Sequence, residues 1–376
     1  MKMKLGDFLL EVNERTTRNN EYPVLTASKE CISLQNQYFK KPVASKDNTG
    51  YKVIHRGQFT YRAMSDTGNF YPNILESVNV GIVSPAYPVF EITNKELVLP
   101  KYLKYYFKSP VFQFGISKFV QGTTRANLHF NKMKTIEIDV PSVDEQYEVV
   151  NCLSKVTSLM EKKKKEIVLL NTMLKARFVE MFGDPILNTH SLQTVELQQL
   201  GSWGSGGTPS RKNDEYFKGN IDWYSAGELN SQYLKKSKEK ITQQAIENSA
   251  TQLLPSGSLL VGMYDTAAFK MGVVTKESSC NQACAFLIPN YSVNVVWLYH
   301  ELSLMKPYFL QQRHGVRQKN LNLGMIKKFM VPIVDINDQN VFVNFVQQVD
   351  KSKAAIQKSI DETQLLYDSL MQKYFG

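Results

Sequence analysis

The sequence predicts an α+β protein built from two related halves, each followed by a long helix. The two helices are expected to pack as an antiparallel coiled coil, so that the halves are related by a pseudo-two-fold axis. Three observations support this fold class. The chain of 376 residues repeats itself, each half mixes short apolar runs with helical segments, and each half closes on a long stretch of helical periodicity.

The repeat is clearest in two stretches that share one register. GTTRANLHF (122–130) and GVRQKNLNL (315–323) lie 193 residues apart, and Gln146 falls on Gln339 at the same offset. The same offset relates the Phe-Gly pairs that end the two halves. Near the two starts QLGSW echoes KLGDF, so the repeat covers nearly the whole chain.

The middle parts of the two halves diverge. YRAMSDTGNFYPN in the first half has no convincing counterpart in WYSAGELNSQYLKK of the second. A repeat that keeps its tail and varies its middle is typical of one scaffold that presents two different surfaces.

The tails carry apolar residues that step by three and four alternately, which is the seam of a coiled coil. Polar residues interrupt the seam at Lys163 and Arg177 and, in the second tail, at Lys353 and Thr363. Neither helix would be stable alone in water, so we expect them to pack on each other rather than to be unrelated core helices. The predicted helix-pair interface consists of Leu153, Val156, Met160, Ile167, Leu170 and Leu174 with Val346, Val349, Ile356, Ile360 and Leu370.

These observations give five segments. GDPILNTHS is the expected linker, because a glycine helix stop is followed two residues later by proline. Before each helix, runs such as VNVGIVSPAYPVFEI and GSLLVGMYD are typical of strands. The segments are a first globular domain (1–143), a first long helix (144–183), a linker (184–194), a second globular domain (195–336) and a second long helix (337–376).

Composition limits the class of protein. A formal net charge of +10 favours a polyanionic partner such as nucleic acid. The four cysteines, Cys31, Cys152, Cys280 and Cys284, lack CxxC spacing, so neither a disulfide framework nor a zinc finger is expected. The chain has no signal-peptide core and no apolar run of about 18 to 20 residues, so we expect a soluble cytoplasmic protein.

No catalytic or metal site is predicted. The sequence lacks the NPPY or DPPY tetrapeptide of a DNA methyltransferase, and its five histidines show no HExxH spacing. The glycine-rich GSWGSGGTPS is not closed by Lys-Ser or Lys-Thr, so we interpret it as a flexible turn before a binding surface and not as a phosphate loop.

Basic residues mixed with aromatics and amides occur in both divergent regions. Such side chains hold phosphates and read base edges, although each one alone is more often a solvated surface group. Lys46 and Lys218 belong to the same pattern. The predicted DNA-binding residues are Arg15, Arg18, Lys40, Lys41, Arg62, Asn69, Tyr71 and Arg125 in the first half, and Arg211, Lys212, Tyr216, Tyr224, Lys270, Arg317 and Lys319 in the second.

The chain resembles the specificity subunit of type I restriction-modification systems. The resemblance rests on LGDF near the start, on QLGSWGSGGTPSRKNDEYFKGNIDWYSAGELN, and on the segments that lead into the helices through Glu145-Gln146 and Asp338-Gln339. The stretch VPIVDINDQ departs from the usual pattern because it lacks the double proline.

The resemblance implies two target recognition domains separated by long helices, each reading one half of a bipartite, asymmetric DNA sequence. It implies double-stranded DNA, two methylation subunits and restriction subunits as partners, and no membrane partner. S-adenosylmethionine, ATP and Mg would belong to those subunits, and no cofactor to this chain. Two alternatives stay open: the recognition subunit of another modification or phage-defence system, and a coiled-coil platform for protein assembly.

The predicted helix pair suggests how a spacer could be fixed. Half-sites on one face of B-DNA lie about 34 Å apart, and helices of about 30 to 36 residues would be about 45 to 54 Å long. We therefore expect the removal of one heptad from both helices to shorten the preferred spacer; an unchanged spacer would refute this idea.

Overall fold

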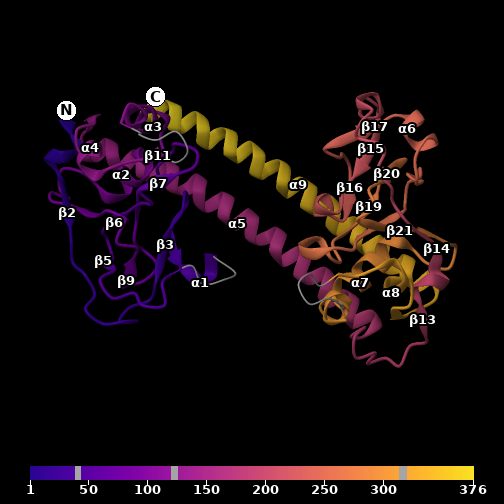
Figure 1. Cartoon of the computed structure of the whole chain (residues 1–376). Helices are drawn as coiled ribbons and strands as arrows, with labels where there is room; N and C mark the ends of the chain where they lie inside the picture. The colour runs from indigo at the N-terminus through magenta and orange to yellow at the C-terminus, as the bar shows by residue number, and fades with distance from the viewer. Residues whose placement is uncertain (39–43, 120–125, 313–319) are drawn as a thin grey trace. The chain divides into compact units, whose positions relative to one another are not determined.

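The computed structural model describes residues 1–38, 44–119, 126–312 and 320–376, and the chain divides into two compact units (Figure 1). Unit 1 comprises Met1–Lys164 and Lys358–Gly376, and unit 2 comprises Lys165–Gln357. Each unit therefore contains one globular half and a stretch of both long helices, whereas the sequence divides the chain into consecutive segments.

The two longest elements are the 40-residue helices α5 (Val143–Phe182) and α9 (Ile336–Phe375). A capping box starts α5: the Glu145 carboxylate accepts the Ser142 backbone N–H at 2.8 Å, and the Ser142 hydroxyl accepts the Glu145 N–H at 3.3 Å. This arrangement satisfies donors that the first helical turn leaves unpaired, so it fixes where the helix begins.

The helices pack along each other in opposite directions. In unit 1, Leu153 from the first part of α5 shares a core with Phe375 from the end of α9. In unit 2, Leu174 from the last part of α5 shares a core with Val346 from the start of α9, and the Lys353 ammonium donates to the Asn171 side-chain oxygen at 3.2 Å. The α+β fold class with an antiparallel helix pair is therefore confirmed.

The side chains of the predicted helix-pair seam are covered to different degrees along its length. The buried members are Leu153, Val156, Met160, Leu174, Val346, Val349 and Ile360, and the half-buried members are Ile167, Leu170, Ile356 and Leu370.

The sheets of unit 1 are small and antiparallel. The largest sheet has four strands in the order β2 (Leu9–Val12), β10 (Val89–Ile92), β6 (Phe59–Thr60) and β8 (Asn73–Ile74). The other sheets each have two strands. These pairs are β1 (Lys2–Lys4) with β12 (Glu137–Asp139), β3 (Leu25–Ala27) with β4 (Ile32–Leu34), β5 (Lys52–His55) with β9 (Val80–Val83), and β7 (Met64–Ser65) with β11 (Ala126–Asn127).

Aromatic side chains fill the core of unit 1. Phe90 of β10 stacks on Phe59 of β6 with ring centroids 5.4 Å apart. Helix α2 (Pro100–Tyr106) covers this cluster, and its Tyr102 ring lies 5.3 Å from the ring of Phe375 at the end of α9. The end of the second helix therefore closes the core of the first globular half, where rings contribute large apolar contact areas.

Unit 2 repeats this plan, and its largest sheet has five strands. Its longest core helix is α7 (Val295–Gln311). The five-stranded sheet has the order β14 (Gly201–Ser205), β21 (Cys284–Pro289), β18 (Leu259–Gly262), β19 (Met271–Val274) and β16 (Tyr233–Leu234). A three-stranded sheet has the order β17 (Glu239–Ile241), β15 (Ile221–Tyr224) and β20 (Ser278–Cys280). A further pair is formed by β13 (Thr194–Glu196) and β22 (Met330–Pro332).

The core of unit 2 is closed by the end of α5. Phe182 packs edge-on against Trp297 of α7, with ring centroids 5.9 Å apart, and against Phe342 of α9 at the same distance. Phe182 and Phe375 are the aromatic residues of the two Phe-Gly pairs at offset 193. The repeated letters thus mark residues that close two equivalent cores, in unit 2 and unit 1 respectively.

The four cysteines are free thiols, and Cys280 and Cys284 are buried in unit 2. Among the residues that the structure describes, no helix combines the length and the hydropathy needed to cross a membrane.

Candidate nucleic-acid interface

Two equivalent hairpin loops carry one sequence pattern. The letters MSDTGNF (64–70) recur as MYDTAAF (263–269), which gives the shared pattern M-x-D-T-x-x-F. The first loop joins β6 to its antiparallel partner β8, and the second joins β18 to its antiparallel partner β19. We call residues 64–70 and 263–269 the first and second motif loops. YRAMSDTGNFYPN therefore has its counterpart at residues 263–269 and not in WYSAGELNSQYLKK, the stretch with which it was compared from the sequence.

The backbone at the start of each motif loop is held by the segment that comes just before the next short helix. The Leu128 N–H donates to the Ala63 carbonyl at 3.0 Å, and the Leu321 N–H donates to the Met263 carbonyl at 2.8 Å. In the second loop the Asp265 N–H also donates to the side-chain oxygen of Asn320 at 3.0 Å. Since Leu128 and Leu321 are 193 residues apart, the repeat preserves this support.

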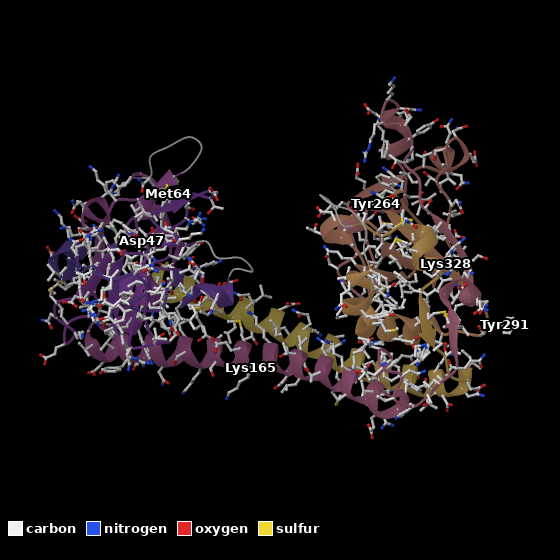
Figure 2. The ribbon with its side chains drawn as sticks, turned by 60° about the horizontal axis from the view of Figure 1, so that its bottom comes forward. Asp47, Met64, Lys165, Tyr264, Tyr291 and Lys328 are labelled. Carbon is white, nitrogen blue, oxygen red and sulfur yellow. The ribbon has the colours of Figure 1, made fainter. Side chains whose placement is uncertain are left out.

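A buried phenylalanine anchors the far end of each loop. Phe70 and Phe269 are both 1% exposed. The loops nevertheless expose a large side chain near their start: Met64 is 45% exposed and Tyr264 is 42% exposed (Figure 2). The framework is therefore common to both loops, and the exposed side chain differs.

Several predicted DNA-binding residues of unit 1 lie on the surface. Arg62 and Asn69 are exposed beside and within the first motif loop. Arg18 is exposed, and Arg15 is exposed while one of its guanidinium nitrogens donates to the Gly50 carbonyl at 2.9 Å. Tyr71 is half-buried, with the Lys29 ammonium 5.5 Å from its ring centroid. Lys40, Lys41 and Arg125 lie outside the described residues.

In unit 2, Arg211 is already engaged by other side chains. Its guanidinium binds both oxygens of Glu239, at 2.5 and 2.8 Å, and lies 4.2 Å from the ring centroid of Phe217. The hydrogen bond to Glu239 raises the pKa of Arg211 further. Lys212 next to it is exposed, and Tyr216 is half-buried.

Tyr224 does not belong to the surface. It is 1% exposed, and burial raises the pKa of its hydroxyl to about 12. Its neighbours on the strand β15, Asp222 and Trp223, are buried as well, so side chains on both faces of this strand are covered. We therefore remove Tyr224 from the DNA-binding set. Lys270 is half-buried and donates to the Asn230 side-chain oxygen at 2.9 Å, and Arg317 and Lys319 lie outside the described residues.

The glycine-rich stretch of unit 2 is not a flexible turn, which corrects the sequence interpretation. Its first five residues form β14. Gly206 and Gly207 follow, and their N–H groups donate to the carbonyls of Cys284 and Cys280, each at 3.0 Å. A Cβ atom on Gly206 would lie 2.2 Å from the Cys280 carbonyl oxygen. These glycines allow close packing of backbone on backbone.

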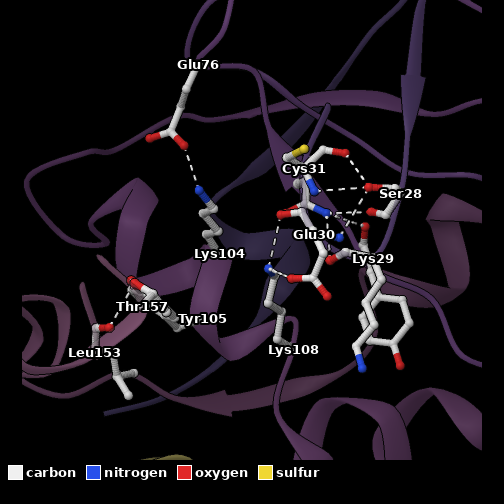
Figure 3. Close-up of polar contacts among 12 residues, drawn as sticks. Ser28, Lys29, Glu30, Cys31, Glu76, Lys104, Tyr105, Lys108, Leu153 and Thr157 are labelled. Carbon is white, nitrogen blue, oxygen red and sulfur yellow. Dashed lines mark hydrogen bonds and ion pairs between the residues drawn. The ribbon is translucent and has the colours of Figure 1, made fainter. Parts of the chain in front are cut away.

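Some lysines of unit 1 are paired within the protein (Figure 3). The Lys104 ammonium lies 2.6 Å from the Glu76 carboxylate, and the Lys108 ammonium donates to the Glu30 carbonyl at 3.1 Å. Burial lowers the pKa of Lys108. Such lysines are poor candidates for phosphate contacts, because binding a phosphate would require them to give up an existing partner.

Two neighbouring residues of α7 are buried ionisable groups. The pKa of His300 is lowered to about 4, mainly by burial; nearby Asp350 opposes this shift and Lys353 adds to it. Glu301 is 1% exposed, and burial raises its pKa well above the usual range. Among the described residues no His, Cys, Asp and Glu cluster could hold a metal ion, so these two groups are not part of a described metal site.

Sequence reasoning missed Met64 and Tyr264, although a signal for them is present. The motif loops are separated by 199 residues and not by 193, because the segments that precede them differ in length. A search that allowed insertions between the anchors would have aligned the M-x-D-T-x-x-F patterns and found the two loops. It would have paired Met64 with Met263, because the equivalence of Met64 and Tyr264 follows only from the backbone bonds.

The fold and these loops define a protein that presents two different surfaces on one repeated scaffold. A family model described as the type I restriction modification DNA specificity domain matches residues 12–169 and again residues 190–363. The chain belongs to this family.

Relatives of the chain carry corresponding names. The specificity subunit of the Escherichia coli type I restriction enzyme EcoR124I/EcoR124II is 24% identical over 248 residues, which cover 62% of this chain and 60% of that protein. The MjaIX specificity subunit of Methanocaldococcus jannaschii is 21% identical over 160 residues, 41% of this chain and 37% of that protein. The chain thus matches less than two thirds of each relative's length.

Solved structures share the fold over the full length of the chain. The S subunit of a type I restriction-modification system from M. genitalium aligns with a TM-score of 0.56 at 13% identity, covering 100% of this chain and 96% of that one. A chain from work on complex assembly and conformational transition of the type I R-M system aligns with a TM-score of 0.54 at 15% identity, covering 100% and 97%.

Proposed function

We propose that this chain is the DNA-sequence specificity subunit of a type I restriction-modification enzyme. In this proposal each globular half reads one half of a bipartite, asymmetric target. The observation that carries it is the pair of motif loops: equivalent hairpins, with equivalent backbone support, expose Met64 in one half and Tyr264 in the other. One scaffold with two different reading surfaces suits two unlike half-sites.

The electrostatic character of the chain supports DNA as the partner. The formal net charge is +10, and Arg18, Arg62 and Lys212 are exposed. Exposed cations bind phosphates without regard to sequence and hold a protein on the duplex, whereas groups that reach base edges supply the specificity.

The chemistry is assigned to partner subunits. We propose that this chain binds two methylation subunits and recruits restriction subunits in the cytoplasm, and that S-adenosylmethionine, ATP and Mg are bound there and not by this chain. The repeat supports two docking places, because the same helix entries and the same core-closing phenylalanines occur in both units.

A selection experiment tests the proposal. The purified chain, with and without a methylation subunit, is incubated at low salt with a library of random duplexes, and bound duplexes are sequenced. The proposal predicts enrichment of one motif made of two unlike parts at a fixed separation. Retention of duplexes without any enriched sequence would contradict it, and retention of none would favour the protein-assembly alternative.

A further inference from the structure

We propose that Met64 and Tyr264 are specificity-determining residues that contact bases, one in each half of the target. The inference rests on the proposed function and deepens it by naming side chains that read the two half-sites. Neither residue belongs to the set of basic, aromatic and amide residues that the sequence suggests for DNA binding.

The first argument is that exposure of a large apolar side chain recurs at one position of the repeat. The carbonyl of the preceding residue, Ala63 or Met263, accepts a hydrogen bond from Leu128 or Leu321. The shared letters align Met64 with Met263, which is only 3% exposed. The backbone bonds instead make Ala63 and Met263 equivalent, so that Met64 and Tyr264 occupy the same place in the two hairpins. These two side chains are 45% and 42% exposed. Single exposed apolar residues are common, but repeated exposure at the same place of a hairpin indicates a role.

The second argument is that the backbone on both sides of each side chain is fixed. In unit 1, Met64 and Ser65 pair with Asn127 and Ala126 as strands β7 and β11. In unit 2, the residues flanking Tyr264 are both hydrogen-bonded, through the Met263 carbonyl and the Asp265 N–H. A rigid support lowers the conformational entropy that is lost when a side chain enters a binding partner.

Backbone strain in the second motif loop also supports a binding role for this loop. Asp265 has a φ of +48° and Phe269 a φ of +55°, in the left-handed region that non-glycine residues seldom adopt. The loop is closed at its base by the Phe269 N–H, which donates to the Gly262 carbonyl at 2.8 Å. Strained residues that the surrounding structure holds in place are typical of binding sites.

The charges around the two side chains favour base edges over phosphates as their targets. Exposed Arg62 precedes the first loop, where it can bind a phosphate at the edge of a groove. Within the loops Asp66 and Asp265 follow Met64 and Tyr264, and carboxylates repel phosphates but accept hydrogen bonds from the amino group of cytosine.

The two side chains differ in the contacts they offer. The Met64 thioether is apolar and flexible, so it suits the methyl group of thymine or a wedge between base pairs. Tyr264 adds an aromatic face that can stack on a base and a hydroxyl that can bind a base edge. This difference fits two unlike half-sites read by one scaffold.

The test uses the full chain in complex with its methylation subunits and the duplex found by selection. Binding constants are measured for Met64→Ala, Tyr264→Ala and Tyr264→Phe on the target and on duplexes scrambled in one half-site. Phe114→Ala in unit 1 and Tyr291→Ala in unit 2 are matched controls, because these rings are 82% and 95% exposed but lie outside the motif loops. Thermal melts establish that each variant is folded.

We expect Met64→Ala and Tyr264→Ala each to weaken binding to the intact target about 5- to 150-fold, the range for loss of one base contact. Each variant should lose discrimination in one half-site only, and in different half-sites. The two controls should bind within about twofold of the wild type. Tyr264→Phe separates the roles of ring and hydroxyl: binding like the wild type assigns the contact to the ring, and binding like Tyr264→Ala assigns it to the hydroxyl.

Failure of this inference is distinguishable from failure of the proposed function. If the wild type selects a target and both alanine variants bind it as the controls do, the inference is overturned while the function stands. If the wild type selects no sequence, the proposed function fails and the inference fails with it.

Discussion

Gln146 and Gln339, 193 residues apart, make the same three hydrogen bonds in the two units. Both are fully buried near the start of a long helix. Each side-chain oxygen accepts the N–H of the residue that caps α2 or α7, and each side-chain nitrogen donates to two carbonyls. The contacts are Leu99 N at 2.8 Å, Leu97 O at 2.9 Å and Pro141 O at 3.1 Å for Gln146, and Asn294 N at 2.7 Å, Ser292 O at 3.2 Å and Val334 O at 2.9 Å for Gln339.

We predict that Gln146→Ala and Gln339→Ala each lower the free energy of unfolding of their own unit by about 2 to 4 kcal/mol, because buried backbone groups lose their partners. Urea titrations measure the change. Gln348→Ala, which alters an exposed glutamine of α9, should cost less than about 0.5 kcal/mol. Equal effects of all three substitutions would contradict the role assigned to the buried amides.

The tryptophans allow one unit to be followed separately. All three, Trp203, Trp223 and Trp297, lie in unit 2. Their fluorescence therefore reports the unfolding of unit 2, and amide hydrogen exchange of α2 reports unit 1.

We predict that His300 makes the free energy of unfolding of unit 2 fall at acid pH. Its pKa is lowered to about 4 in the folded protein, mainly by burial, against an ordinary value of 6.5. Between these values the unfolded chain binds the proton and the folded chain does not, so stability falls as the pH is lowered from 6.5 toward 4. The free energy of unfolding of the wild type falls as the pH is lowered from 7 to 5, and His300→Phe should make this fall smaller by about 1 to 2 kcal/mol. Urea titrations followed by tryptophan fluorescence measure it.

Exposed His190 provides the control for His300, since His190→Phe removes a histidine of the same unit from the surface. If the free energy of unfolding falls between pH 7 and pH 5 by the same amount in His300→Phe and in the wild type, the His300 ring is not responsible for the fall.

Glu301 should act in the opposite direction. Its pKa is raised by burial, so the folded protein keeps a proton that the unfolded chain releases above about pH 4.5. Stability is therefore fully present below that pH and is lost as the pH rises toward the folded-state pKa. Glu301→Gln keeps the shape without an ionisable group, and it should raise the free energy of unfolding by more than about 1 kcal/mol at pH 8 while changing it little at pH 4.

Exposed Glu277 gives the matched control for Glu301, because Glu277→Gln makes the same chemical change on the surface of unit 2. A Glu301→Gln variant that is less stable than the wild type at pH 8 would refute the assignment of a neutral carboxyl.

Phosphate contacts should make DNA binding depend steeply on salt. We predict that Arg18→Ala and Lys212→Ala each reduce the slope of log K against log salt by about 1 and weaken binding equally on all sequences. Lys104→Ala removes a lysine that is already paired with Glu76 and should leave the slope unchanged. Identical slopes for all of these variants and the wild type would exclude the two exposed cations from the interface.

The features that follow from the repeat could be predicted from sequence. The helices α5 and α9 cover the stretches whose apolar residues step by three and four, and Gln146 and Gln339 stand out as invariant letters of the repeat. Local periodicity predicts the apolar seam of each helix, and the fixed offset between the halves predicts which residues are repeated. Both signals can be recognised without knowing any contact between distant residues.

The interface could be predicted less well, because it depends on contacts between distant residues. Arg211 is bound by Glu239, 28 residues away, and no spacing rule indicates that pair. Tyr224 lies on a strand covered on both faces, where alternation does not separate inside from outside. The equivalence of the motif loops was hidden because insertions shift their offset from the rest of the repeat.

The most direct test of the central claim is single-molecule mapping of methylated adenine in the genome of a host with and without this gene. The account predicts one gapped motif, with two unlike parts and a constant spacer, that is methylated in the first strain and unmethylated in the second. Methylation patterns that are the same in both strains would contradict the claim that this chain directs modification to a bipartite sequence.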